Sequence, residues 1–481
     1  MRLKILLLLS FTLGLFLSSC TTGPAMGTNT PTPPIPSAIP SSTSTQIPAP
    51  TKTTTRLPVS DGPTLLIQTN FETYEIIDFG LGISYPIELP GVNPGDRLSG
   101  ILSPSRSQLL LSSDPTQVPI LDLPTGNIED FDRPSVNAFQ PEQAAEAALA
   151  ALAGMKYSEE AALEAVKSAH DQSTRIARWG QDDGHLFIVS SDSATDTHLT
   201  SLSLTTGEQT MLEQESGILE NFWVRGEKIL IKKGYVFEPG FWQDDIYFVL
   251  DRNSGEVTAI PLPADADQPS LSWLGVNSLK VIHQADPAGG FGFSIMDLNS
   301  LVWKTIVQGA FSSISPYQDG WLLFVQDTTA PTTLIQRLNP EGAPQADVTL
   351  PEPCFLYDIL DETILINCET ESLKLNGELS VESFDEPIFL LSGSPDGETL
   401  ILITRTDTVH QLAANLTIQV TLTLEGAPLE VRWLPDSTGF LYRTKGHLYA
   451  YDLARDINQD LLASDLLSDY TNLNAVWINL D

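Results

Sequence analysis

Beyond residue 63 the sequence consists of short apolar runs, alternating or continuous, that are separated by clusters of Pro, Asp, Gly and Ser. Runs of this kind predict short β-strands joined by tight turns. Four segments each predict two strands around such a turn: FLLSGSPDGETLILITR (389–405), VRWLPDSTGFLYRT (431–444), ARWGQDDGHLFIVSS (177–191) and SSISPYQDGWLLFVQ (312–326). Weaker copies begin near residues 100, 221, 271 and 354. We therefore expect an all-β protein.

A second repeated element, strand–turn–strand, follows the strand pairs. Its turn often reads Asp-x-x-Ser/Thr-Gly, as at residues 122–126 and 251–255. Glycine supplies the positive φ of such a turn, and Asp or Ser caps it. The repeating unit is therefore expected to have four strands.

The strand pairs recur near residues 102, 179, 223, 273, 314, 356, 393 and 433, mostly about 37 to 50 residues apart. A four-stranded unit with this period predicts a β-propeller, whose blades bury their faces against their neighbours. The last residues, DYTNLNAVWINLD, predict a first strand, and the segment from Thr64 predicts later strands without a first. Together they would form one blade that ties the two ends and removes exposed edges. This count gives nine units, but propellers usually have four to eight blades. We therefore expect eight, with seven as the alternative.

The repeat resembles the TolB-like and WD-type propellers, in which a Ser-Pro-Asp-Gly turn joins the first two strands of a blade. The full motif occurs at Ser394, Pro395, Asp396 and Gly397, and residues 434–437 are a near match. The resemblance covers residues 64–481 and implies the propeller architecture, without pointing to one member of these families.

A helical segment interrupts the repeat. Residues 141–170, PEQAAEAALAALAGMKYSEEAALEAVKSAH, predict two helices around residues 154–158, with Ser158 as the N-cap of the second. The whole insertion is placed at residues 136–172, between two blades. It either caps the centre of the propeller or docks a partner, or it packs against the side of a blade.

The N-terminus resembles a bacterial lipoprotein signal. Arg2 and Lys4 precede an apolar stretch of about 13 residues, which is too short for a bilayer span of roughly 20. Leu17, Ser18 and Ser19 then precede Cys20, as in a lipobox. The resemblance implies that residues 1–19 are removed and that Cys20 carries lipid. Residues 20–63, rich in Thr, Ser and Pro, are expected to be a disordered tether. The protein is thus expected on the outer face of the cell membrane or on an outer membrane.

The formal net charge of the 481-residue chain is −36. Such a surface repels phosphate backbones and acidic lipids, so we expect no nucleic-acid partner and a membrane contact through Cys20 alone.

The two remaining cysteines bracket CFLYDILDETILINC. A hairpin centred on Asp361 places Cys354 opposite Cys368. Opposite residues of a non-hydrogen-bonded pair lie about 4.5 Å apart at Cα, within disulfide range. An oxidising compartment favours the bond, and a cross-strand disulfide is predicted.

The sequence offers no strong catalytic signature. Its six histidines lack metal-ligand spacing, and it has no Cys-x-x-Cys, no Gly-x-Ser-x-Gly elbow and no phosphate-binding loop. We therefore predict no catalytic, cofactor or metal residues. The aspartates that recur in the first turns of blades are interpreted as turn residues. Possible ligand contacts are Phe241, Trp242, Asp244 and Asp245, since aromatic rings beside carboxylates can grip sugars or peptides; the alternative is a solvated hairpin tip.

These features favour a lipid-anchored propeller that binds a protein partner or acts as a scaffold at the cell envelope, rather than an enzyme. Two alternatives stay open. One is an envelope enzyme acting on carbohydrate through carboxylates, and the other is a sensor or solute-binding lipoprotein, which would need a ligand-sized pocket. Fold alone does not decide among them.

Overall fold

The computed structural model describes residues 62–479, apart from residues 71–72, 81, 90–91, 93–96, 112–115, 134–138, 152–158, 192–193, 239–240, 264–266, 287–289, 328–330, 361, 385–387 and 464–472. All of these described residues belong to the compact unit Gln46–Asp481. The expected signal peptide, Cys20, nearly all of the expected tether and the expected N-cap Ser158 lie outside them.

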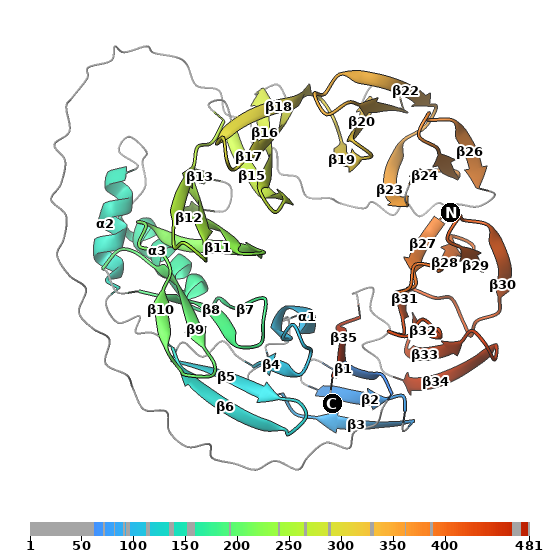
Figure 1. The fold of residues 1–481 in the computed structure, drawn as a ribbon, viewed down its shortest axis with the longest axis horizontal. Helices are drawn as coiled ribbons and strands as arrows, with labels where there is room; N and C mark the ends of the chain where they lie inside the picture. The colour runs from blue at the N-terminus through green and yellow to red at the C-terminus, as the bar shows by residue number, and fades with distance from the viewer. Residues whose placement is uncertain are drawn as a thin grey trace, which may run out of the picture. The chain divides into compact units, whose positions relative to one another are not determined.

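Nine antiparallel sheets follow one another along the described part of the chain and form the blades of a β-propeller (Figure 1). We number the blades in chain order from the one that contains β1. Blade 1 comprises β1 (Thr64–Asn70), β2 (Thr73–Asp78), β3 (Ile83–Ile87) and β35 (Ala475–Ile478), and blade 2 comprises β4 (Gln108–Leu110), β5 (Gln117–Asp122) and β6 (Asn127–Asp132). Blade 3 comprises β7 (Ala177–Trp179), β8 (His185–Ser190), β9 (His198–Ser203) and β10 (Gln209–Met211). Blade 4 comprises β11 (Ile218–Arg225), β12 (Lys228–Glu238), β13 (Phe241–Asp251) and β14 (Val257–Ile260).

The remaining blades have the same order of strands, and in Figure 1 their first strands lie on the inner side of the ring. Blade 5 comprises β15 (Asp267–Gly275), β16 (Ser278–Asp286), β17 (Gly290–Asp297) and β18 (Val302–Gly309), and blade 6 comprises β19 (Ser313–Tyr317), β20 (Gly320–Asp327), β21 (Thr332–Leu338) and β22 (Pro344–Leu350). Blade 7 comprises β23 (Cys354–Leu360), β24 (Thr363–Cys368), β25 (Ser372–Leu375) and β26 (Val381–Phe384), and blade 8 comprises β27 (Ile388–Gly393), β28 (Thr399–Thr404), β29 (Val409–Ala413) and β30 (Ile418–Leu422). Blade 9 comprises β31 (Glu430–Trp433), β32 (Gly439–Thr444), β33 (His447–Asp452) and β34 (Ile457–Ala463).

The propeller prediction is confirmed, but the expected number of eight blades, or seven, is wrong. A hydrophobic cluster joins each blade to the next around the whole circle, including blade 9 to blade 1. Every repeat seen in the sequence is therefore a separate packing unit. The weakest of them, blade 2, keeps its place with three strands, because the short helix α1 (Leu98–Ile101) and a bridge between Leu102 and Leu109 occupy the position of its first strand.

The strand β28 shows why the second strands read as continuous apolar runs. Leu400 and Leu402 pack against blade 7, and Ile401 and Ile403 pack against blade 9. Successive side chains of a strand point to opposite faces of its sheet, and here both faces are covered. Burying each of these side chains stabilises the fold by about 1.5–3 kcal/mol relative to exposure.

Side-chain hydrogen bonds repeat between neighbouring blades. The indole N–H groups of Trp179, Trp273 and Trp433 donate to carbonyls of the preceding blade or of its α1 helix, at Ile101, Trp223 and Ser392. A hydroxyl within one residue of the start of a third strand accepts a backbone N–H from the start of the next blade. This occurs three times: Thr197 accepts from Leu219, Thr333 from Cys354 and Ser372 from Ile388. These bonds fix the height of one blade relative to the next.

The predicted closure of the ring is also confirmed. β35 pairs with β1 in antiparallel register, with Thr64 opposite Ile478 and Ile67 opposite Ala475. Both ends of the propeller therefore meet within blade 1, where β35 covers the inner edge of β1.

Two helices form in the expected insertion, α2 (Pro141–Ala151) and α3 (Glu159–Ser173). Ala144 and Ala145 of α2 and Ala162 and Val166 of α3 share a cluster with Ile218 at the start of β11. Of the two expected placements, packing against a blade is the one observed.

Cys354 and Cys368 stand opposite each other in the β23–β24 hairpin and form a disulfide with a Cα–Cα distance of 4.1 Å. Both cysteines are buried between blades 6 and 7.

We predict that the double variant C354A/C368A unfolds at lower denaturant concentration than the wild type. We expect its free energy of unfolding to fall by about 3 kcal/mol, because the disulfide closes a loop between residues 14 positions apart. Equilibrium unfolding in guanidinium chloride measures this loss, and two free thiols in denatured, unreduced wild type would contradict the pairing.

Candidate functional site

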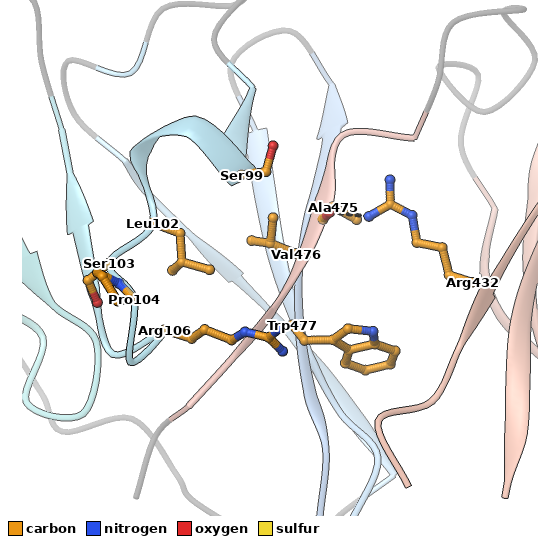
Figure 2. Close-up of a pocket in the computed structure, with 9 residues that line it drawn as sticks. All are labelled: Ser99, Leu102, Ser103, Pro104, Arg106, Arg432, Ala475, Val476 and Trp477. Atoms are coloured by element: carbon orange, nitrogen blue, oxygen red, sulfur yellow. Dashed lines mark hydrogen bonds between the residues drawn. The ribbon is translucent and has the colours of Figure 1, made fainter. Parts of the chain in front are cut away.

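A pocket lies on the inner side of the propeller where blades 9, 1 and 2 meet (Figure 2). Its volume is about 350 Å³, which falls within the range of about 300–1,000 Å³ typical of small-molecule sites. The residues that line it are Ser99, Leu102, Ser103, Pro104, Arg106, Arg432, Ala475, Val476 and Trp477. The pocket therefore combines residues from near both ends of the propeller and contains two arginines.

One of these arginines, Arg432, holds the ring closed. Its Nε lies 3.0 Å from a carboxylate oxygen of Glu430, and its terminal nitrogens donate to the carbonyls of Leu473, at 2.6 Å, and Ala475. Glu430 in turn accepts the backbone N–H of Leu473 at 2.7 Å, and Arg443 Nε lies 3.7 Å from it. We call this group of Glu430, Arg432 and Arg443 the clasp. It fixes the strand β35.

The other arginine, Arg106, stands at an unusual turn position. Its φ is +66°, and its N–H bonds to the carbonyl of Ser103. Gly397 and Ser437 have the same role in blades 8 and 9, with φ of +75° and +60°. The turn Ser-Pro-Ser-Arg of blade 2 is therefore a copy of Ser-Pro-Asp-Gly with arginine in the place of glycine. The Arg106 side chain is exposed, and among the described residues it has no hydrogen-bond partner.

Trp477 forms the flat wall of the pocket. It is half-buried, and its ring centroid lies 5.7 Å from that of Phe79. Figure 2 shows the Arg106 guanidinium directed toward this indole, whereas the Arg432 guanidinium is directed toward the backbone of Ala475.

A second surface feature lies on the inner strands of blades 7 and 8. Phe355, the second residue of β23, is 59% exposed, and Phe389, the second residue of β27, is 46% exposed. Asn367 stands opposite Phe355 and donates to the carbonyl of Ile388 at 2.8 Å. We call Phe355 and Phe389 the phenylalanine pair. The other strongly exposed large apolar side chains of the described residues lie on second, third or fourth strands or in a turn: Ile83, Ile246, Val276, Ile282, Phe291, Val302, Val381, Ile418, Val420 and Ile457.

Beneath the helical insertion lies a buried ion pair that the sequence analysis missed. Lys233 Nζ is 2.8 Å from Glu213, and both side chains are 1% exposed or less. The carboxylate also accepts the N–H groups of Leu199 and Glu215, at 2.9 and 2.8 Å. Burial raises the pKa of Glu213, but the neighbouring His198 and the Lys233 ammonium outweigh it and hold this pKa below its ordinary value. Burial lowers the pKa of Lys233, and Glu213 opposes that shift.

The predicted ligand contacts Phe241, Trp242, Asp244 and Asp245 belong to the strand β13, but their side chains lie outside the described residues. The recurrent aspartates act in turns, as interpreted from the sequence. Asp396 accepts from Ser394 and from the N–H of Glu398, and Asp436 accepts from Thr438. The hydroxyl of Ser394 lowers the pKa of the Asp396 carboxyl.

Within the described residues, one group of three possible metal ligands lies together: Glu352, Cys354 and Cys368. Both sulfurs are joined in the disulfide, so they are not available as thiolates. A search of the same residues found no helix with the length and apolar composition of a membrane span.

No protein-family model matches the sequence, and no curated protein matches it. Several solved structures are similar in fold. A eukaryotic initiation factor is 10% identical over 87% of this chain and 98% of its own, with a TM-score of 0.48. Apo AztD from Citrobacter koseri is 10% identical over 86% and 98%, with a TM-score of 0.38. The β-propeller domain of the Trilobed protease from Pyrococcus furiosus is 13% identical over 50% and 82%, with a TM-score of 0.33. The assignment as a propeller rests on the nine sheets themselves.

The buried pair yields a stability prediction. K233M leaves the Glu213 carboxylate buried without its cation, so we expect a loss of about 3–5 kcal/mol in the free energy of unfolding. K233M/E213Q removes both charges and should recover part of that loss. K167M breaks the exposed pair with Glu142, at 3.9 Å, and should cost less than about 1 kcal/mol. Urea unfolding of the three variants measures these differences.

The same pair predicts a dependence on pH. Because the folded pKa of Glu213 is lowered, its charge stabilises the fold above the unfolded pKa of about 4.3. That contribution is lost as the pH falls through the folded pKa, and E213Q should lack this part of the acid loss. Equal acid profiles for E213Q and the wild type would contradict it.

Proposed function

We propose that this protein is a lipid-anchored, extracytoplasmic β-propeller that binds an envelope protein through its inner strands. The observation that carries the proposal is the phenylalanine pair, two large aromatic side chains exposed on neighbouring first strands. Exposed aromatic residues held on a rigid support are the typical anchors of protein interfaces. Asn367, which links the two strands, fixes their relative position.

Charge defines the partner further. A chain with a net charge of −36 repels other acidic proteins and attracts basic ones, mainly by accelerating their encounter. We therefore expect a partner with an apolar patch at the centre of its contact surface and lysines or arginines around it. The pocket supports this binding role over hydrolysis of glycans, since the described residues of its lining include two arginines and no carboxylate, whereas glycosidases generally use a pair of carboxylates.

The lipobox around Cys20 supports the proposed anchor. Two or more acyl chains on this cysteine would hold the protein stably at a membrane.

We predict that C20A leaves the protein without lipid and releases it, or its precursor, from the lipidated membrane pool. Metabolic labelling with an alkyne fatty acid, followed by detergent phase partitioning, measures both effects. Equal labelling of C20A and wild type would contradict the anchor.

The phenylalanine pair is tested by substitution. We predict that F355A/F389A lowers the recovery of a stoichiometric partner at least tenfold after mild crosslinking in the native cells, because aromatic anchors typically contribute about 2 kcal/mol or more. Folding should be nearly unchanged, since exposed side chains contribute little to stability.

The matched control is V381A/I418A, which removes apolar side chains of similar exposure from the fourth strands of the same two blades. It should leave recovery of the partner unchanged. If both double variants recover the wild-type amount, or lose it equally, the inner strands are not the binding surface.

A further inference from the structure

We infer that the pocket between blades 9, 1 and 2 binds a small carboxylate that carries a ring, with Arg106 pairing with the carboxylate and Trp477 covering the ring. This site is separate from the phenylalanine pair and does not depend on the proposed protein partner.

The charge of the pocket selects an anion. Among the described residues, its lining contains two guanidiniums and no carboxylate. Arg432, which lines the pocket, is paired with Glu430, which is not among these lining residues. Asp183 accepts the N–H of Ser105 in this turn at 3.0 Å and is not among the described residues that line the pocket. In a chain of net charge −36, this local positive field gives an anion a specific place to bind.

Arg106 is available for the ligand, and Arg432 is not. The donors of Arg432 already serve Glu430, Leu473 and Ala475. Arg106 has no such partner among the described residues, and its planar fork matches a carboxylate in bidentate geometry.

The backbone of Arg106 is a further indication. The left-handed backbone conformation costs a residue with a Cβ atom about 1–2 kcal/mol of conformational free energy, whereas glycine adopts it without this penalty. Blade 8 has glycine at this position and blade 9 has Ser437 at a φ of +60°, whereas blade 2 has the larger, charged arginine at +66°. Strained positions of this kind gather at ligand sites, where the surrounding structure holds them. The turn is thus a rigid mount that directs the guanidinium toward Trp477 (Figure 2).

Trp477 determines the body of the ligand. Its indole is half-buried against Phe79 and forms one wall of the pocket. A flat aromatic wall binds the face of an aromatic ring or the apolar face of a sugar ring. Ring-bearing acids therefore come from two sources, aromatic acids and sugar acids, and the volume of about 350 Å³ has room for either.

Isothermal titration of the full-length, lipidated protein in detergent at low ionic strength tests the site with defined probes. These are benzoate and glucuronate, their neutral counterparts benzyl alcohol and methyl glucoside, and acetate, which has a carboxylate without a ring. We expect saturable binding of benzoate, glucuronate or both, at least tenfold tighter than the neutral counterparts and acetate. Binding of one acid alone identifies its source as the natural class.

The decisive variant is R106G, which removes the guanidinium and relaxes the turn. It should weaken binding of the ring acids at least tenfold while its melting temperature stays equal to or above that of the wild type. The matched control S437G changes the same turn position in blade 9 and should leave binding unchanged. The inference is overturned if neither ring acid binds up to millimolar concentration, or if R106G binds as tightly as the wild type.

Discussion

The structure depends on one constraint: each blade must be covered on both faces by its neighbours. The alternate packing of β28 against blades 7 and 9 shows the rule within a single strand. A blade at a free end would expose one such face and an open strand edge, so the ring has to close. Two features close the ring. The strand β35 pairs with β1, and in the clasp Arg432 donates hydrogen bonds to the backbone carbonyls of Leu473 and Ala475.

Much of this could be predicted from the sequence, because the periodic burial leaves a periodic pattern. The run TLILIT of β28, the turn at residues 394–397, the two helices and the closing strand all have local signals. The sequence placed Cys354 opposite Cys368 through a hairpin centred on Asp361, whereas the strands pair Leu360 with Thr363 and reach this register through a bulge between Leu356 and Asp358. The number of blades was wrong for a different reason. The repeats in the sequence already numbered nine, but the usual range of propellers favoured a smaller count.

The functional features were harder to predict, since they depend on contacts between blades. Lys233 ends the apolar run ILIKK and has the sequence pattern of a solvated strand end; only the packing of blade 3 on blade 4 brings Glu213 to it. Phe355 and Phe389 follow the pattern of core residues, yet both side chains are strongly exposed on the first strands of blades 7 and 8. The signal that was present and overlooked is Arg106, which stands where the sister turn has glycine.

The pocket follows from how the ring closes. Blade 2 has a short helix and a single bridge in place of a first strand, so its inner side is lined by Ser99 and the turn up to Arg106. Blade 1, its neighbour, presents the last strand of the chain with Trp477. A ligand between Arg106 and Trp477 therefore contacts both the turn of blade 2 and the closing strand β35. Such a ligand binds only while β35 is paired with β1. By mass action, such a ligand stabilises the closed ring by about 2.7 kcal/mol at a concentration one hundred times its Kd. Binding at this point and closure of the ring are thus linked equilibria, so each favours the other.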